Sequence, residues 1–320
     1  MRGEEELIDI IMEIVGRDKE ELLGVGRDDA SARKLDEGVY VFNVDSLAES
    51  SDLLPGMSLR DFGRKAVIFN YSDLAAKGAK PIFFMASLTL QGWRSTKDFE
   101  EIVRGIEEGA TEYDTHLVGG DLGSGDELNL AGFAVGKVIN RLVSRSGSRP
   151  GDLIYVTGKF GLTWLAFKHL LEGMELPKRL VSRALRSVYR PVARVREGIL
   201  ISRYATSCID SSDGLYKSLK ELSRSSGNGF LIDRLPIDEE VLKFVEKKGI
   251  DPIEPTFYGG EEFHLVFTVS EEVASRMEAY LRSEGLSPIA IGRVVEESGV
   301  LYRGEEVPAG GWNHFSRSNS

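Results

Sequence analysis

Residues 66–81 constrain what this chain can fold into more than any other stretch. They read Ala-Val-Ile-Phe-Asn-Tyr-Ser-Asp-Leu-Ala-Ala-Lys-Gly-Ala-Lys-Pro. A short β-prone run leads into polar residues, and small residues then follow until Gly78 and Pro81. This order predicts a strand over residues 66–69, a polar turn and a packed helix. Asp73 would then be held where the strand stops.

The same arrangement recurs, because five separate stretches place an acid just past an apolar or glycine-rich segment. The acids are Asp28 with Asp29, Asp45, Asp73, Asp121, and Asp210 with Asp213. A single such Asp is usually a turn or helix-capping residue. Several carboxylates gathered in one place stay ionised only if cations hold them. Mg²⁺ prefers hard oxygen ligands and shares its shell between carboxylates and substrate phosphates. The sequence therefore predicts a magnesium-nucleotide site assembled from several loops.

Composition limits the class of protein. A net charge of −11 argues against a nucleic-acid partner and an anionic-membrane surface. Cys208 is the only cysteine, so no intrachain disulfide is possible and a reducing compartment is expected. The first residues are acidic, which is wrong for a signal peptide, and no apolar run approaches the roughly 20 residues that a membrane span needs. We expect a cytoplasmic protein.

The length of 320 residues favours two domains. The polar, turn-rich segment 144–152 lies between two strand-like runs and is the best boundary candidate. We therefore predict domains over residues 1–143 and 144–320. Strands and helices mix in both halves without regular alternation. Each half is expected to be an α/β domain of the α+β type, with a mixed or antiparallel sheet and helices on one face.

Two further segments have simpler interpretations. Residues 4–16 have the apolar periodicity of a helix that docks on a domain. Residues 48–60 are polar and contain Pro55-Gly56, which predicts a loop. The glycine-rich stretch 24–31 is not a P-loop, because no Gly-Lys-Ser/Thr follows it.

Taken in order, eight motifs resemble those of the thiamine-monophosphate kinase family, within the aminoimidazole-ribonucleotide-synthetase-like ATP-binding superfamily. They lie at residues 27–31, 44–46, 70–79, 119–121, 145–152, 210–215, 259–265 and 311–315. The resemblance implies a two-domain subunit that forms a homodimer through its N-terminal domain. It also implies Mg²⁺-assisted, in-line transfer of the γ-phosphate of ATP to thiamine phosphate, which gives thiamine diphosphate.

The resemblance assigns roles to particular residues. The expected Mg²⁺ ligands are Asp29, Asp45, Asp73, Asp121, Asp210 and Asp213. The expected ATP contacts are Gly120, Asp121, Arg145 and Ser212, and the expected substrate contacts are Asp52, Glu261 and Trp312. Asp73, Asp210, Asp213 and Arg145 are the residues expected to carry phosphoryl transfer.

These residue types suit that chemistry. Phosphoryl transfer needs positioning and charge neutralisation more than a strong base. Arg145 offers a bidentate phosphate contact that lysine would not reproduce. A carboxylate at Glu261 and the flat face of Trp312 suit a cationic thiazolium joined to an aminopyrimidine.

The chain departs from the family pattern at several positions. Arg27 replaces a glycine, and Asn43 and Val44 stand where hydroxyl residues are common. Asp52 occupies the position of a histidine that contacts substrate in the family.

Four alternatives share these acids. An aminoimidazole ribonucleotide synthetase-like cyclo-ligase would share the acids, and it needs no thiol. A nucleotide-binding regulator without turnover would also keep them. Selenophosphate synthetase and the hydrogenase-maturation branch fit less well, because they need a cysteine near the N-terminus or at the C-terminus, respectively.

Overall fold

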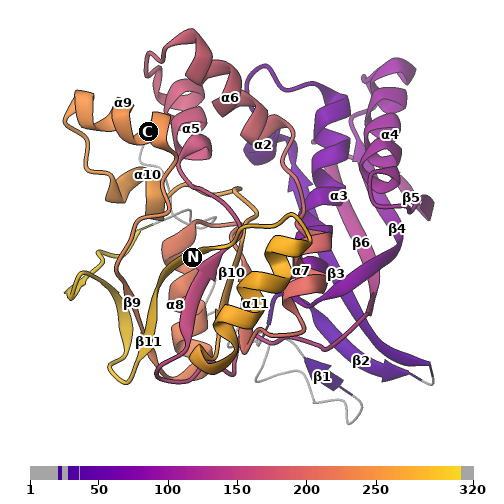
Figure 1. Ribbon diagram of the computed structural model, residues 1–320. Helices are drawn as coiled ribbons and strands as arrows, with labels where there is room; N and C mark the ends of the chain where they lie inside the picture. The colour runs from indigo at the N-terminus through magenta and orange to yellow at the C-terminus, as the bar shows by residue number, and fades with distance from the viewer. Residues whose placement is uncertain (1–20, 24–27, 36, 311–320) are drawn as a thin grey trace.

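Two sheets, formed from successive parts of the chain, frame the molecule (Figure 1). The computed structural model describes residues 21–23, 28–35 and 37–310. The predicted helix at 4–16, Arg27 and Trp312 lie outside the described residues.

The first sheet has six strands in the order β1-β2-β3-β6-β4-β5. Its strands are β1 Glu21–Leu23, β2 Ser31–Leu35, β3 Gly38–Ala48, β4 Ala79–Leu90, β5 Leu117–Ser124 and β6 Asn129–Val138. Among its described strands only β4 and β5 pair in parallel, so the sheet is mixed, as expected. The helices of this half are α2 Glu49–Asp52, α3 Leu59–Ala76 and α4 Thr96–Thr111.

The second sheet has seven strands in the order β13-β12-β9-β11-β7-β10-β8. Its strands are β7 Leu153–Val156, β8 Ser207–Asp210, β9 Gly229–Ile232, β10 Leu265–Val269, β11 Ile289–Val295, β12 Gly299–Tyr302 and β13 Glu305–Glu306. Within the described part of the chain, only β9 and β12 of this sheet pair in parallel. Its helices are α5 Leu162–Glu172, α6 Lys178–Tyr189, α7 Val195–Ile201, α8 Leu215–Ser226, α9 Glu239–Lys248, α10 Ile253–Phe257 and α11 Glu271–Ser283.

Helices cover both faces of the second sheet, so the expectation of one covered face is wrong for this half. Alternate residues of a strand point to opposite faces. Tyr155 and Phe267 belong to one apolar cluster, whereas Ile154 and Val266 belong to another with Leu219 of α8. The α/β class with mixed sheets and packed helices is confirmed.

The predicted strand at 66–69 is wrong, because residues 59–76 form the single helix α3. Ser58 caps its start by accepting a hydrogen bond from the Asp61 backbone N–H at 3.0 Å. A short apolar run does not separate a strand from a buried helix. Here the helix is buried on nearly every side, which is why its sequence lacks a polar stripe.

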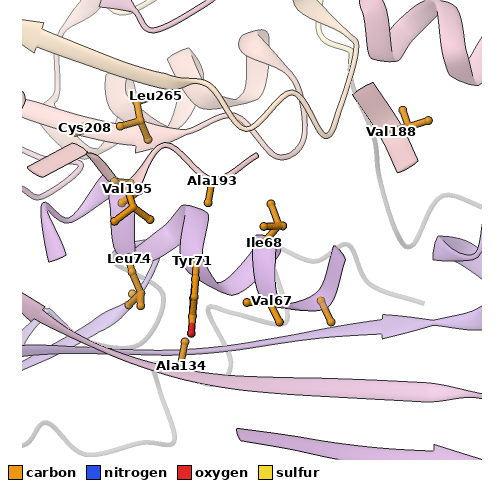
Figure 2. Packing of buried hydrophobic residues seen from close by; sticks show 14 of the residues in the cluster. Val67, Ile68, Tyr71, Leu74, Ala134, Val188, Ala193, Val195, Cys208 and Leu265 are labelled. Atoms are coloured by element: carbon orange, nitrogen blue, oxygen red, sulfur yellow. The ribbon is translucent and has the colours of Figure 1, made fainter. Parts of the chain in front are cut away.

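Helix α3 lies between the first sheet and the second half of the chain (Figure 2). Tyr71 and Leu74 point toward Ala134 of β6, and Val195 and Cys208 lie on the opposite side. Close packing on α4 depends on Gly63, since a Cβ there would lie 2.2 Å from a backbone oxygen of α4. The helix can therefore carry side chains to the junction of the two sheets.

The expected loop over 48–60 is partly helical, because α2 occupies residues 49–52. The segment 144–152 contains no helix or strand and joins the two sheets. The domain boundary there remains a prediction. No described helix has the length and apolarity that a membrane crossing requires.

Candidate metal and phosphate site

Three acids from distant parts of the chain meet where the two sheets adjoin. Asp29 lies two residues before β2, Asp73 lies in the last turns of α3, and Asp210 is the last residue of β8. Carboxylate oxygens of the three lie within 4.8 Å of one another. We call these three residues the acid group.

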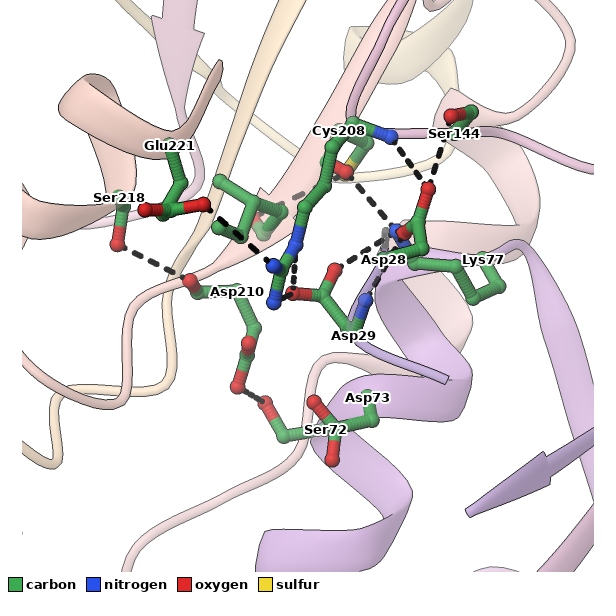
Figure 3. Close-up of polar contacts among 12 residues, drawn as sticks. Asp28, Asp29, Ser72, Asp73, Lys77, Ser144, Cys208, Asp210, Ser218 and Glu221 are labelled. Carbon is green, nitrogen blue, oxygen red and sulfur yellow. Dashed lines mark hydrogen bonds and ion pairs between the residues drawn. The ribbon is translucent and has the colours of Figure 1, made fainter. Parts of the chain in front are cut away.

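Asp29 is held by two cations (Figure 3). Lys77 Nζ lies 2.7 Å from its carboxylate, and Arg145 Nε donates to it at 2.6 Å. Burial alone would raise the pKa of Asp29, but Arg145 and Lys77 hold that pKa below its usual value. The negative charge of Asp29 is thus compensated within the protein.

Asp28 anchors the same cations to the segment that joins the sheets. Its carboxylate pairs with Lys77 and accepts hydrogen bonds from Ser144 Oγ at 2.8 Å and the Arg145 backbone N–H at 2.9 Å. Lys77 Nζ also donates to the Cys208 carbonyl at 3.1 Å. One buried lysine therefore joins α3, the Asp28-Asp29 pair and β8.

Among the described residues, the side-chain donors to the carboxylates of Asp73 and Asp210 are neutral. Asn43 Nδ2 donates to Asp73 at 2.6 Å, and Ser72 Oγ donates to Asp210 at 2.6 Å. Burial raises the pKa of Asp210 to about 7, and the charge of Asp29 adds to this. Burial, Asp210, Asp29 and Asp45 raise the pKa of Asp73 well above its usual value. Among the described residues no lysine or arginine pairs directly with either carboxylate, although the charge of Arg145 acts to lower both pKa values.

The acid group fits a divalent cation. Its donors are carboxylate oxygens, the ligand type that Mg²⁺ prefers. They converge within reach of one ion, and the raised pKa values of Asp73 and Asp210 report charge that a cation would relieve. The charge of Asp45 also acts to raise the pKa of Asp73.

Asp45 and Asp121 lie inside strands β3 and β5, not beyond strand ends as predicted. The strand register places Asp45 and Asp121 in neighbouring rows of residues that pair across the sheet. Asp45 shares a row with Gly132, Ala86 and Gly120, whereas Asp121 pairs with Ser87 in the next row. Neighbouring rows point to opposite faces. Asp121 is therefore on the other face of the sheet from Asp45, and within one chain it is not brought to the acid group.

The expected substrate residues Asp52 and Glu261 lie together around a buried lysine. Lys65 Nζ is 2.8 Å from Glu261 Oε1 and 3.5 Å from the Asp52 carbonyl. The Glu261 backbone N–H donates to Ser212 O at 2.5 Å, and the charge of Asp213 acts on Glu261. Ser212, Asp213, Asp52 and Glu261 thus form a second group next to α3.

Sequence reasoning missed Lys65 and Lys77, which hold both groups together. Lys65 lies in α3 and Lys77 directly after it, both at buried positions where a charge has to find a partner, but the sequence alone does not identify that partner. Arg145 was expected to bind phosphate, but its contact with Asp29 was not predicted.

Comparison with known proteins identifies relatives of the whole chain. Residues 27–138 match the family described as AIR synthase related protein, N-terminal domain, and residues 149–303 match its C-terminal domain. A thiamine-monophosphate kinase of Pyrococcus horikoshii is 37% identical over 90% of this chain and 90% of its own. The Nitrosopumilus maritimus enzyme of that name is 31% identical over 98% of both chains.

A solved structure described as AaThiL complexed with AMPPCP and TMP has a TM-score of 0.87 and 30% sequence identity. The match covers 98% of this chain and 99% of that chain. Similarity in fold therefore extends over both sheets.

Proposed function

Because the chain belongs to the thiamine-monophosphate kinase family, we propose that it transfers the γ-phosphate of ATP to thiamine phosphate and forms thiamine diphosphate. The observation that carries this proposal is the convergence of Asp29, Asp73 and Asp210 at the junction of the two sheets. The solved relative bound to an ATP analogue and TMP, similar over nearly its whole length, supports the same substrates.

Asp29, Asp73 and Asp210 would hold Mg²⁺, with Asp45 beside them and Asp213 on the substrate side. Mg²⁺ would supply charge neutralisation for the triphosphate oxygens. Arg145 uses only part of its five N–H donors on Asp29, so others can bind a phosphate oxygen. Lys77 fixes Asp28 and Asp29, which orients Arg145 toward the site.

We assign ATP contacts to Gly120, Asp121, Arg145 and Ser212, and substrate contacts to Asp52, Glu261 and Trp312. Glu261 contacts α3 at Lys65, about two turns before Ser72, which donates to Asp210. The Asp52 carboxylate already accepts from the Ala48 backbone N–H at 2.9 Å and Ser51 Oγ at 2.6 Å. It therefore has less capacity for substrate than Glu261.

We further propose a homodimer formed through the first sheet. Large apolar side chains that are exposed among the described residues of its strands include Val44, Ile82 and Val118. Across the sheet Val44 pairs with the partly buried Phe133, and Phe133 pairs in turn with Met85. Asp121 lies on this same face, so a second copy would bring it to an interface.

The net charge of −11 supports small-molecule substrates over nucleic acid, and the single buried Cys208 supports the cytoplasm as location. We retain residues 1–143 and 144–320 as the proposed domains, with the second completing the site that the first begins. Sedimentation of wild type and Val118→Asp tests the homodimer: a monomeric wild type would overturn it.

The decisive experiment is to incubate purified protein with ATP, Mg²⁺ and thiamine phosphate, with an EDTA control. Metal-dependent thiamine diphosphate confirms the activity. Absence of product, with ATP still bound, would favour a cyclo-ligase acting on formylglycinamidine ribonucleotide, which the same assay can test as substrate. Binding of ATP without turnover of either substrate would leave the nucleotide-binding regulator.

A further inference from the structure

Lys65 occupies an unusual place for a lysine. Its side chain is fully buried in α3, and its ammonium lies 2.8 Å from Glu261 Oε1. The Phe69 ring centroid is 5.2 Å from the same nitrogen, and the Asp52 carbonyl is 3.5 Å away. A buried ammonium is costly unless it is paired, so Glu261 is the partner that makes this position tolerable.

Glu261 is fixed from its backbone as well as from its side chain. Its φ of 61° is a left-handed conformation that a side-chain-bearing residue rarely adopts. The strained turn is held by hydrogen bonds from Glu261 N to Ser212 O and from Phe263 N to Ser211 O at 2.9 Å. Phe263 also packs on Phe69, with ring centroids 4.8 Å apart. The backbone thus delivers the carboxylate to Lys65.

The two oxygens of that carboxylate differ. Oε1 receives the lysine, whereas Oε2 is buried without a hydrogen-bond partner among the described residues. A buried carboxylate oxygen without a donor is unfavourable and marks a place where a ligand donor belongs. Asp52 and Asp213 add negative charge on the same side, which favours a cationic ligand.

We propose that Lys65 is a positioning residue for substrate recognition: by binding Glu261 Oε1, it leaves Oε2 aimed at an N–H donor of a cationic heteroaromatic substrate. The inference rests on the proposed function, because it takes Glu261 as a contact of the thiamine moiety. Lys65 itself does not touch substrate. It sets which carboxylate oxygen is available and places a positive charge against that carboxylate.

The test is a double-mutant cycle on the full chain with steady-state kinetics for both substrates. Lys65→Met should raise the KM for thiamine phosphate about tenfold, the size expected for a lost hydrogen bond to a charged group, while the KM for ATP stays within about twofold. Lys159→Met is the matched control, because Lys159 pairs with Glu239 at an exposed site. It should leave both KM values unchanged.

The double variant Lys65→Met/Glu261→Gln separates positioning from folding, because it removes both buried charges. If Lys65 acts through Glu261, the double variant has the same thiamine-phosphate KM as Glu261→Gln alone. A further rise in KM over Glu261→Gln, or a folded Lys65→Met with wild-type KM values, overturns the inference. If the wild type forms no thiamine diphosphate, the proposed function fails, which is a distinct result.

Discussion

The two halves of the acid group differ in how their charge is balanced. Asp29 is enclosed by Lys77 and Arg145, and its pKa is lowered. Asp73 and Asp210 receive hydrogen bonds from Asn43 and Ser72, which carry no charge, and their pKa values are raised. The first half is an internal salt-bridge network that joins the two sheets. The second half has no directly paired cation among the described residues, so a bound cation would relieve its repulsion.

The largest expected effect tests the compensated half. Lys77→Met leaves Asp28 and Asp29 buried with one cation fewer, which should lower the free energy of unfolding by about 3–5 kcal/mol. Urea denaturation in EDTA measures it. Lys80→Met, three residues along and exposed, is the control and should change stability by less than about 0.5 kcal/mol. Equal stability of both variants would show that Asp29 is not held by Lys77.

Asp73→Asn tests the second half of the acid group, where we expect activity to fall and stability to be kept. Removing its charge should reduce kcat by about 100-fold or more, because Asp73 would hold Mg²⁺ at the phosphates. The same change should leave the melting temperature in EDTA equal or higher, since it removes repulsion from Asp210 and Asp29. Asp126→Asn, at an exposed position, is the control for the Asp-to-Asn change. Near-normal turnover at saturating Mg²⁺ would contradict the metal assignment.

The acids could be predicted from sequence because each belongs to a motif with local turn residues. Asp29, Asp73 and Asp210 were expected to gather, and they do. The elements that carry them were less predictable. Asp73 sits in a helix whose buried faces hide its period, and that helix was taken for a strand and a turn.

The charge balance could not be predicted, because it depends on contacts between residues far apart in the chain. Lys77 reaches Asp28, 49 residues away, and Lys65 reaches Glu261, 196 residues away. Neither pairing has a local sequence signal. The face on which Asp121 lies also depends on strand register, which a one-residue shift reverses.

Glu262 is a buried carboxyl outside the acid group, so it can be compared with Asp73 and Asp210. It accepts the Gly161 backbone N–H at 2.7 Å, and burial raises its pKa to about 7 from an ordinary value of 4.5. As pH rises, Glu262 therefore loses its proton at a lower pH in the unfolded chain than in the folded chain. Stability from this group is full below about pH 4.5 and falls as pH rises to about 7.

Glu262→Gln should thus gain stability relative to wild type between pH 5 and pH 8, on the order of 1–3 kcal/mol at about 1.4 kcal/mol per pKa unit. Urea denaturation at the two pH values measures the difference. Mg²⁺ should not alter it, because Glu262 is not part of the acid group. A gain that Mg²⁺ abolishes would mean that cation binding is not confined to the acid group.

The smallest expected effect tests whether Mg²⁺ stabilises the protein through Asp73 and Asp210. Mg²⁺ at tenfold excess over its Kd should stabilise the wild type by about 1.4 kcal/mol, measured as a rise in melting temperature over EDTA. Asp210→Asn should lose that rise, and Asp126→Asn should keep it. Because Lys77 and Arg145 already balance Asp29, the gain from Mg²⁺ must come through Asp73 and Asp210. An undiminished rise in Asp210→Asn would place the cation elsewhere and leave Asp73 and Asp210 without a metal-binding role.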